Sequence, residues 1–413
     1  MDKGLCIGCV LCMRACPTKA IRVRDGKATR VGDKCIDCGE CIRVCPKGAI
    51  RAVTTWSGEA ELSPYSVVGA SPVLYAQFGN EAMPNDILIA LRRIFNYVYD
   101  QAYAHELYNA VTELYIKGNR GKGEAVLPLI SPVCPVVNRL IAMRFPSLLK
   151  QVLPFMPPRE FAAREMRKRF KQKKIFGDKE AAVYHVSPCA AKMISIQAPI
   201  FTEKSYLSGA VGINEIYDLV GKHLGEEDED LVLHLSSGVG IGWGMSGGEI
   251  AGLDDVTALA VSGMQETIRY LEKIEMGLFR NIEYFEFRFC PEGCIGGPLT
   301  VADKYQAKGI LQKFGHMFGQ GKRVRRFQVQ KAYQEGWFLR ERREMGKVKD
   351  VKDEKRLPIA EAIARQDRIE SIFRKLPGKE CGQCGSPDCR TFAEDVADGV
   401  MTPESCFLLR SFS

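Results

Sequence analysis

The chain opens on CIGCVLCMRACP, residues 6–17, and repeats the same pattern as CIDCGECIRVCP, residues 35–46. Both runs have the form C-x2-C-x2-C-x3-C-P, a spacing that holds 4Fe-4S clusters in pairs. In such pairs the fourth cysteine of each run binds the other cluster. We therefore expect one cluster on Cys6, Cys9, Cys12 and Cys45, and a second on Cys35, Cys38, Cys41 and Cys16. A pair of zinc ribbons is the alternative.

The remaining composition is typical of a folded globular protein. Of the 413 residues, 46% are hydrophobic and 26% are charged, which is enough for about two to four domains. No stretch reaches the roughly 18 apolar residues of a membrane-spanning helix, and no secretory leader precedes the first cysteine. We therefore interpret the sixteen cysteines as metal ligands of a cytoplasmic protein rather than as a disulfide framework.

The net charge of +8 does not require a nucleic-acid or membrane partner. Four clusters of about −2 each, held by thiolates, would roughly cancel this charge. The basic run RKRFKQKK at residues 167–174 fits the solvated face of a helix that follows Pro157 and Pro158. A docking surface for an acidic electron carrier is the second interpretation of this run.

A third cysteine group lies near the end of the chain, at Cys381, Cys384, Cys389 and Cys406. It resembles the small four-cysteine 4Fe-4S domain that is attached to various anaerobic redox proteins. The segment RTFAEDVADG at residues 390–399 predicts a short helix that ends at Gly399. Zinc is the alternative metal here, because C-x2-C spacing alone does not separate the two.

The last four cysteines are widely separated in the sequence: Cys134, Cys189, Cys290 and Cys294. Three predicted strands, at residues 124–131, 181–187 and 282–288, each end shortly before one of them. The carboxyl ends of parallel strands are where ligands bind in open α/β sheets. We therefore expect one shared cluster site. Separate buried core cysteines are the alternative.

Three segments around these cysteines resemble the signatures of the FeFe-hydrogenase family. They are SPVCPVV at 131–137, VSPCAAKM at 186–193 and FCPEGCIGG at 289–297. The resemblance implies that the four cysteines hold a 4Fe-4S cubane. It also implies that Cys294 bridges to a two-iron unit with carbonyl and cyanide ligands, the two parts forming the H-cluster. Lys192 matches the lysine that hydrogen-bonds a cyanide ligand.

Several positions depart from the family pattern. The proton-relay cysteine is replaced by Val133, and of the two relay glutamates only Glu113 persists, Ala110 standing at the inner position. Two methionines that pack on the two-iron unit become Ser187 and Arg288. Candidate catalytic residues are thus limited to Lys192 and Glu113. The chain looks most like the sensory branch of the family, which keeps the cubane ligands and alters the relay.

A glycine-rich loop follows the strand-like segment LVLHLSS at residues 231–237. Gly242, Gly244 and Gly247 in this loop formally match the dinucleotide fingerprint. No acidic residue stands at the distance that nucleotide binding requires, so we expect the loop to pack against the cluster site instead.

We expect a multidomain α/β protein. Residues 1–56 should form a ferredoxin-like α+β domain with two clusters, and residues 57–302 an FeFe-hydrogenase-like α/β core of parallel sheets flanked by helices. Residues 303–376 should form a helical connector, or a dimer seam, with an apolar stripe over Ile359, Ile363 and Ile369. Residues 377–413 should form the C-terminal 4Fe-4S domain. The accessory clusters would then make an electron wire with a port at each end of the chain.

The expected function is hydrogen or redox sensing with weak or no H2 turnover. Electrons would pass through three accessory 4Fe-4S clusters to a redox or signalling partner, ferredoxin being one candidate. One alternative is a slow, ferredoxin-coupled hydrogenase that interconverts H2 with protons and electrons. Another is a non-catalytic iron–sulfur scaffold or electron-transfer subunit. The chain ends at Ser413 without room for a further signalling domain, so we expect either a partner protein or a longer parent chain. A homo-oligomer is a separate expectation.

Overall fold

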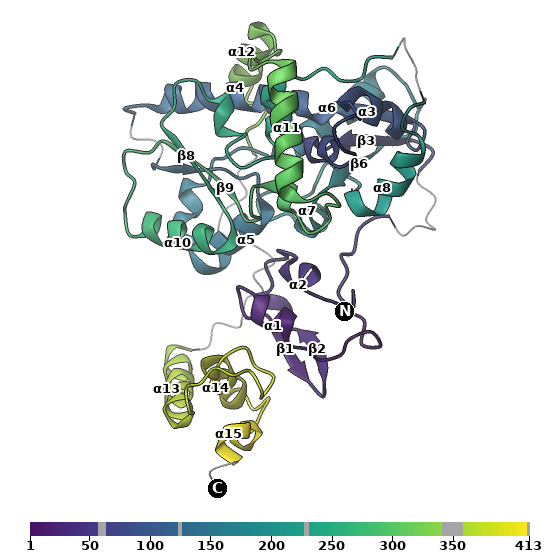
Figure 1. Ribbon diagram of the computed structural model, residues 1–413. Helices are drawn as coiled ribbons and strands as arrows, with labels where there is room; N and C mark the ends of the chain where they lie inside the picture. Colours follow the sequence, from purple (N-terminus) through teal and green to yellow (C-terminus); the bar gives the residue numbers. More distant parts are fainter. Residues whose placement is uncertain (57–62, 123–125, 227–230, 341–357, 411–413) are drawn as a thin grey trace. The chain divides into compact units, whose positions relative to one another are not determined.

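The computed structural model describes residues 1–56, 63–122, 126–226, 231–340 and 358–410. The chain divides into two compact units (Figure 1). Unit 1 combines Met1–Ala52 with Lys349–Ser413, and unit 2 is Val53–Val348. Among the described helices, none has both the length and the apolar character needed to cross a lipid bilayer.

The N-terminal part of unit 1 is built around its two cysteine runs. A short helix follows the start of each run, α1 (Leu11–Ala15) in the first and α2 (Glu40–Arg43) in the second. Between them lie an antiparallel hairpin of β1 (Ile21–Arg24) and β2 (Lys27–Arg30), then the 3-10 turn η1 (Gly32–Lys34). A small apolar core of Met13, Ile21, Ala28 and Ile50 packs with the cysteines. Such a small core leaves much of the stabilisation to bound metal.

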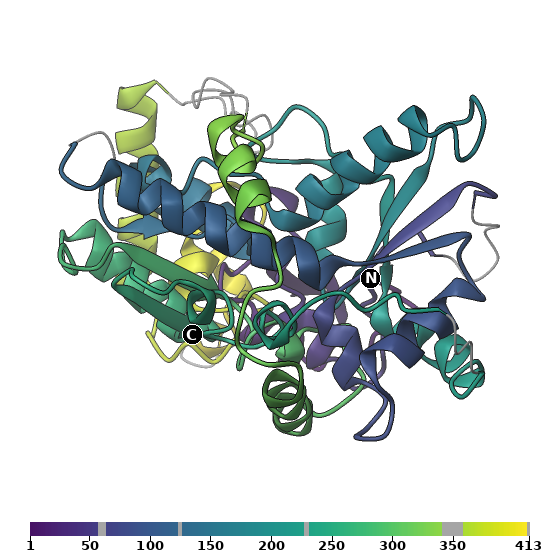
Figure 2. The ribbon, with the colours of Figure 1, turned by 90° about the horizontal axis from the view of Figure 1, so that it is seen from above.

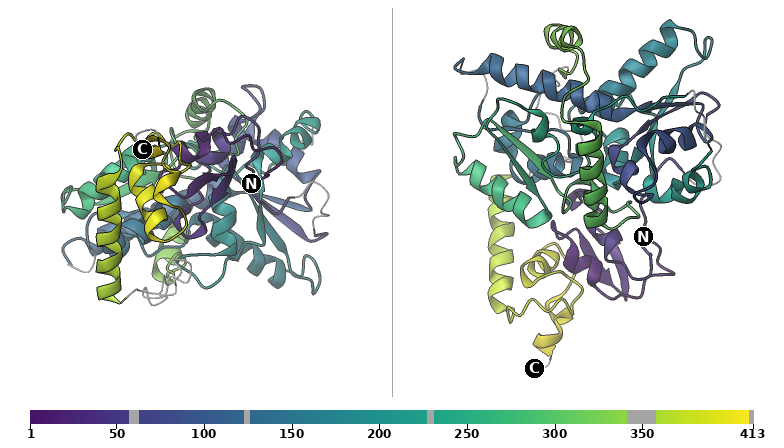
Figure 3. Two further views of the ribbon diagram at one scale, coloured as in Figure 1. Left: turned by 90° about the horizontal axis from the view of Figure 1, so that it is seen from below. Right: turned by 45° about the horizontal axis from the view of Figure 1, so that its top comes forward.

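The C-terminal part of unit 1 is helical, with α13 (Ile359–Lys375), α14 (Cys389–Ala397), the 3-10 turn η6 (Pro403–Ser405) and α15 (Phe407–Arg410). Asp388 caps α14 by accepting the backbone N–H of Thr391 at 2.7 Å. The helix ends before Gly399, whose φ of 71° stops it as predicted. Along the apolar stripe of α13, Ile369 is buried whereas Ile359 remains 81% exposed. The hairpin and this helical segment lie side by side (Figure 3).

Unit 2 contains two parallel sheets. The first has the order β4 (Tyr97–Asp100), β3 (Ser66–Ala70), β6 (Ala182–Ser187) and β7 (Gly209–Gly212). All five residues of β3 are buried, as expected of a central parallel strand covered on both faces. The helices that accompany this sheet are α3 (Pro84–Arg92), α4 (Gln101–Asn119), α6 (Pro158–Gln172), α7 (Ala190–Gln197) and α8 (Ile213–Lys222).

The second sheet has the order β5 (Leu129–Ile130), β9 (Tyr284–Arg288) and β8 (Ala258–Ser262). Tyr284 of β9 pairs with both neighbours. Around it lie α5 (Pro135–Arg144), the 3-10 turns η3 (Pro146–Gln151) and η4 (Ile250–Gly252), and α10 (Met264–Glu275).

One long helix, α11 (Lys304–Phe318), stands in front of the two sheets in Figure 1 and is seen end-on, to one side of both, in Figure 2. Ala307, Ile310, Leu311 and Phe314 of this helix are buried in the core of the first sheet. Short elements η2 (Pro72–Ala76), α9 (Gly238–Gly242) and η5 (Cys294–Gly296) pack around it, and α12 (Arg326–Gln334) follows.

The fold class predicted from the sequence is confirmed, and the strands expected at 181–187 and 282–288 are β6 and β9. The strand expected at 124–131 shortens to β5, with residues 124 and 125 outside the described residues. The residues of the expected connector divide between the units, since α11 and α12 belong to unit 2 and α13 to unit 1. Both terminal segments of the chain belong to unit 1.

The strand-like segment at residues 231–237 has no regular structure. Side chains satisfy the backbone N–H groups that a strand would offer to a neighbour. Asn85 Oδ1 accepts from Leu233 and His234, and Asp100 Oδ2 accepts from Leu235 and Ser236. These side-chain acceptors replace a sheet partner for this segment.

Candidate metal centres

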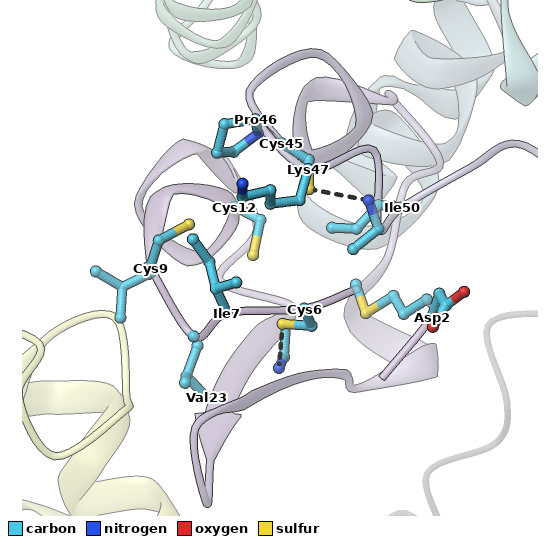
Figure 4. Close-up of a pocket in the computed structure, with 15 residues that line it drawn as sticks. Asp2, Cys6, Ile7, Cys9, Cys12, Val23, Cys45, Pro46, Lys47 and Ile50 are labelled. Atoms are coloured by element: carbon cyan, nitrogen blue, oxygen red, sulfur yellow. Dashed lines mark hydrogen bonds between the residues drawn. The ribbon is translucent and has the colours of Figure 1, made fainter. Parts of the chain in front are cut away.

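The first tetrad lines a hollow in unit 1 (Figure 4). The hollow measures about 420 Å³ including its opening to solvent, and its wall contains all four cysteines expected for the first cluster: Cys6, Cys9, Cys12 and Cys45. Backbone N–H groups donate to two sulfurs, from Ala28 to Cys6 Sγ at 3.4 Å and from Ala49 to Cys45 Sγ at 3.3 Å. The Ala28 N–H lowers the pKa of Cys6, which favours the thiolate that binds iron.

The second tetrad brings Cys16 of the first run among the cysteines of the second. Burial raises the pKa of Cys41 to about 12, and the nearby thiols of Cys35 and Cys16 raise it further. Burial likewise raises the pKa of Cys38, again with a contribution from Cys16. The N–H of Ala20 donates to Cys16 Sγ at 3.2 Å. The structure thus places Cys16 with the second run, which is the crossed arrangement expected from the spacing.

The C-terminal tetrad lines a hollow of about 350 Å³ including its opening, and all four cysteines of the group are in its wall: Cys381, Cys384, Cys389 and Cys406. Burial raises the pKa of Cys384, and the thiols of Cys406 and Cys381 add to the rise. Within the described residues, no three His, Cys, Asp or Glu side chains lie close enough to hold a single metal ion. The thiols of the first and last tetrads instead surround a space.

The four core cysteines come from strand ends in both sheets of unit 2. Cys134 precedes α5 after β5, Cys189 precedes α7 after β6, and Cys290 and Cys294 follow β9. Burial raises the pKa of Cys189 to about 11, and the thiols of Cys134 and Cys294 add to the rise because they lie close by. Cys290 lies in the same turn as Cys294, its carbonyl accepting the N–H of Gly293 at 3.2 Å. The structure therefore brings these scattered cysteines into one region.

Tight backbone contacts hold the core segments together. The Leu299 N–H donates to the Pro188 carbonyl at 3.0 Å. A Cβ on Gly297 would lie 2.3 Å from that same carbonyl oxygen, so only glycine permits this approach. The glycine-rich loop at 238–248 meets the third segment from another side, where Ile295 N–H donates to the Gly244 carbonyl at 3.1 Å. The glycines of this loop therefore serve packing at the cysteine site.

Buried cations face the core thiols. Lys192 is 8% exposed, and its ammonium is the strongest influence that opposes the raised pKa of Cys189. Arg159 is 5% exposed and donates to the Val133 carbonyl at 3.3 Å and to Ser195 Oγ at 3.1 Å. Burial lowers the pKa of Arg159, while the carboxylate of the adjacent glutamate and the core thiols oppose this effect. The sequence did not reveal Arg159, because nothing separates it from the other 57 lysines and arginines.

Arg288 is part of a buried ionic cluster beside this site, which we call the Glu249–Arg288 cluster. Its guanidinium donates to Glu249 Oε2 at 2.8 Å and lies 3.5 Å from Glu286. Glu249 also accepts from Ser131 Oγ at 3.0 Å and from the Tyr284 hydroxyl at 2.5 Å. Burial raises the pKa of Glu286 to about 7, although Arg288 opposes the rise. One feature of the sequence could have indicated this cluster: Glu286 is a charged residue between the aromatic residues of β9.

The predicted relay residues lie on or near α4. Val133, at the position of the relay cysteine, is buried. Glu113 forms ion pairs with two lysines, with Oε1 2.7 Å from Lys117 and Oε2 3.3 Å from Lys322. Burial would raise the pKa of Glu113, but the two lysines outweigh it and lower the pKa. A second glutamate on α4, Glu106, is fully buried and accepts backbone N–H groups, from Ser237 at 2.5 Å among them. Glu106 was not predicted. Ala110, at the inner relay position, has no carboxylate, and Ser187, at one of the two methionine positions, has no thioether.

Two histidines form a buried polar chain near the core cysteines. His185 Nδ1 is 2.8 Å from Gln101 Oε1, and Gln101 Nε2 is 3.3 Å from His105 Nε2. The His105 ring stacks on Trp243 with ring centres 4.5 Å apart. Burial, assisted by Lys192, lowers the pKa of His105 to about 3 and that of His185 well below its ordinary value. Both rings are therefore neutral at physiological pH.

Three segments of the chain match known families. Residues 65–254 match the iron only hydrogenase large subunit, C-terminal domain. Residues 5–50 match a 4Fe-4S dicluster domain, and residues 376–407 match a family described by its Fe-S cluster. These matches relate residues 65–254 to iron-only hydrogenases and both terminal segments to iron–sulfur domains.

Solved structures show the same fold. A variant of the FeFe-hydrogenase HydA1 from Chlamydomonas reinhardtii aligns with a TM-score of 0.52 at 14% identity, covering 70% of this chain and 97% of that one. An apo form of another HydA1 variant gives 0.51 at 13% identity, over 68% and 91% of the two chains. Among curated proteins, the corrinoid/iron-sulfur protein large subunit of Moorella thermoacetica is 46% identical over 35 residues. That match spans 8% of each chain.

Proposed function

We propose that this chain is a hydrogen- or redox-responsive iron–sulfur protein of the FeFe-hydrogenase family with weak or no H2 turnover. One observation carries the proposal. Cys134, Cys294 and Lys192 lie close to Cys189, yet the residue before Cys134 is the buried Val133, whose carbonyl accepts a hydrogen bond from Arg159. The site is thus built to hold its metal group and poorly built to deliver protons to it.

The chemistry of the core fits a cubane with an attached two-iron unit. Four thiolates are the ligand set of a 4Fe-4S cluster, and buried cations offset the negative charge that such a cluster carries. In our proposal Cys134, Cys189, Cys290 and Cys294 would hold the cubane, Cys294 would also serve as a ligand of the two-iron unit, and Lys192 would donate a hydrogen bond to that unit. When bound, this group would supply reversible electron exchange with H2.

Slow turnover follows from the groups that surround the site. Proton transfer needs titratable groups within hydrogen-bond reach of one another. Valine offers none at position 133, and the guanidinium groups of Arg159 and Arg288 do not give up a proton in proteins. Glu113 stays ionised between two lysines. Because each 1.36 kcal/mol of added barrier slows a reaction about tenfold, the loss of one relay step should slow turnover by about tenfold or more.

The state of the core must reach a partner to serve as a signal. We propose that electrons move between the core and the clusters of unit 1, and from there to a redox or signalling protein. The exposed basic residues within 167–174 belong to unit 2 and so offer a separate surface, where an acidic carrier would exchange electrons with the core itself.

Infrared spectroscopy of the chain matured with the two-iron cofactor tests the proposal. Carbonyl and cyanide bands that shift under H2, with little H2 consumed, support a responsive protein. Absence of these bands, with iron stopping at about sixteen per chain, would leave only cubanes and so a scaffold. Cys294→Ser is the control, because it should remove the bands. Rapid turnover in the unaltered protein would establish a hydrogenase and contradict the proposal.

A further inference from the structure

A charged seam joins the N-terminal hairpin of unit 1 to its C-terminal helical segment. Arg22 donates to both carboxylate oxygens of Asp395, at 2.7 and 3.0 Å, and Arg24 donates to the same carboxylate at 2.7 Å. The side chains of Arg22 and Asp395 are only 6% and 13% exposed. Lys19 with Asp388, and Lys34 with Glu394 at 2.9 Å, extend the seam. Two-pronged contacts of this kind fix orientation as well as adding energy.

The backbones also meet across this seam. The Val23 N–H donates to the Gly385 carbonyl at 2.9 Å, and Arg24 donates to the Cys384 carbonyl at 2.9 Å. Arg14 donates to the Cys381 carbonyl at 3.3 Å. A Cβ on Gly385 would lie 1.8 Å from the Val23 carbonyl oxygen, so the approach requires glycine. The hairpin and α1 thus hold the C-terminal tetrad through the backbone carbonyls of two of its cysteines.

Val23 links the two cysteine sites. It lines the hollow of the first tetrad beside Cys6 and Cys9 (Figure 4), while its backbone contacts Gly385. Gly385 is adjacent to Cys384, which lines the C-terminal hollow. The path between the two hollows therefore runs through one valine and one peptide contact.

We infer that the C-terminal cluster exchanges electrons directly with the first N-terminal cluster, and that the Arg22–Arg24–Asp395 seam positions the two for this exchange. One electron leaves one cluster and enters the other, and no bond is made or broken and no proton moves. The inference concerns unit 1 alone and holds whether or not the core responds to hydrogen. Electrons that enter at the C-terminal segment would then reach the N-terminal clusters within the same unit.

A pair of glycine variants tests the seam. Gly385→Ala would place a methyl group against the Val23 carbonyl, whereas Gly378→Ala has a similar positive φ (65° against 75°) with nothing within 4 Å of the added carbon. Both variants add strain from a positive φ. A difference between them therefore measures the effect of the methyl group on the contact between Val23 and Gly385. We expect amide hydrogen exchange at Val23 to rise about tenfold or more in Gly385→Ala and to stay near wild type in Gly378→Ala. Equal hydrogen exchange at Val23 in both variants would contradict the contact between the hairpin and the C-terminal segment.

The electron-transfer claim needs a magnetic readout. In the fully reduced wild-type protein, the spins of the two clusters should interact and broaden each other's electron paramagnetic resonance signals. Asp395→Asn keeps the shape of the side chain and weakens its pairing with Arg22 and Arg24, so this interaction should fall. Asp398→Asn is the matched control, because Asp398 pairs with Arg365 at 2.7 Å within the C-terminal segment itself. An interaction that is absent from wild type, or unchanged in Asp395→Asn with all iron retained, would overturn the inference.

Discussion

Replacing Arg288 by methionine should destabilise unit 2 because it removes the cation of the Glu249–Arg288 cluster. Arg288, Glu249 and Glu286 are all at most 1% exposed. Breaking a buried ion pair costs about 3–5 kcal/mol, since a charge is left without a partner. Glu249 keeps its bonds from Ser131 and Tyr284, so we expect the lower end, about 3 kcal/mol. At roughly 2–4 °C per kcal/mol for a large domain, the thermal midpoint should fall by about 6–12 °C.

The assay is thermal unfolding followed by circular dichroism on anaerobic protein. Arg144→Met is the matched control, because Arg144 pairs with Glu272 at 2.5 Å where both side chains are exposed, 50% and 39%. Exposed pairs contribute about 0–1 kcal/mol, so this control should lose little. The double variant Arg288→Met/Glu249→Gln should recover most of the loss, since it removes the unpaired charge.

The reasoning would be refuted if Arg288→Met had the same thermal midpoint as Arg144→Met. It would also be refuted if the double variant had a thermal midpoint no higher than that of Arg288→Met. Either result would mean that the ion pair between Arg288 and Glu249 does not stabilise unit 2 as the structure implies.

Three further predictions concern protons, pH and metal. Val133→Cys should raise H2 evolution by about tenfold or more in protein matured with the two-iron unit; gas chromatography against Val133→Ala checks this, and equal rates in the two variants would count against a missing relay. Burial favours the protonated form of Glu286, so the stability it contributes should be present below about pH 4.5 and be lost as the pH rises towards about 7. Thermal midpoints of wild type and Glu286→Gln across that range should therefore converge at low pH and separate at high pH, whereas parallel curves would be inconsistent with the raised pKa. Cys406→Ser should lower the iron content by about four per chain, measured by colorimetric iron assay; unchanged iron would exclude Cys406 as a ligand.

The parts of the fold that are predictable from sequence are those set by local patterns. The strands β6 and β9 are apolar runs bounded by turn residues, and the cysteine spacing of the N-terminal runs is enough to assign Cys16 to the second tetrad. The short β5 was overestimated because Pro128 lies within its apolar run. Residues 231–237 look like a strand, but their hydrogen-bond partners are the side chains of Asn85 and Asp100.

The parts that were not predictable depend on contacts between distant segments. Arg159 and Val133 are 26 positions apart and meet only because α6 packs on the core. The Arg22–Asp395 contact joins residues 373 positions apart. A single sequence gives no signal for such pairs, because each residue alone is an ordinary charged residue. Two positions identified only as departures from a pattern have buried partners in the structure: the backbone carbonyl of Val133 accepts from Arg159, and Arg288 pairs with Glu249.

The central claim is that the core responds to hydrogen while protons reach it slowly. The most direct test measures the infrared response to H2 and the rate of H2 consumption on one matured sample. We predict carbonyl and cyanide bands that shift under H2 and reverse under argon, with turnover far below that of a relay-restored Val133→Cys protein. Bands that ignore H2, or turnover that matches the Val133→Cys protein, would contradict the account.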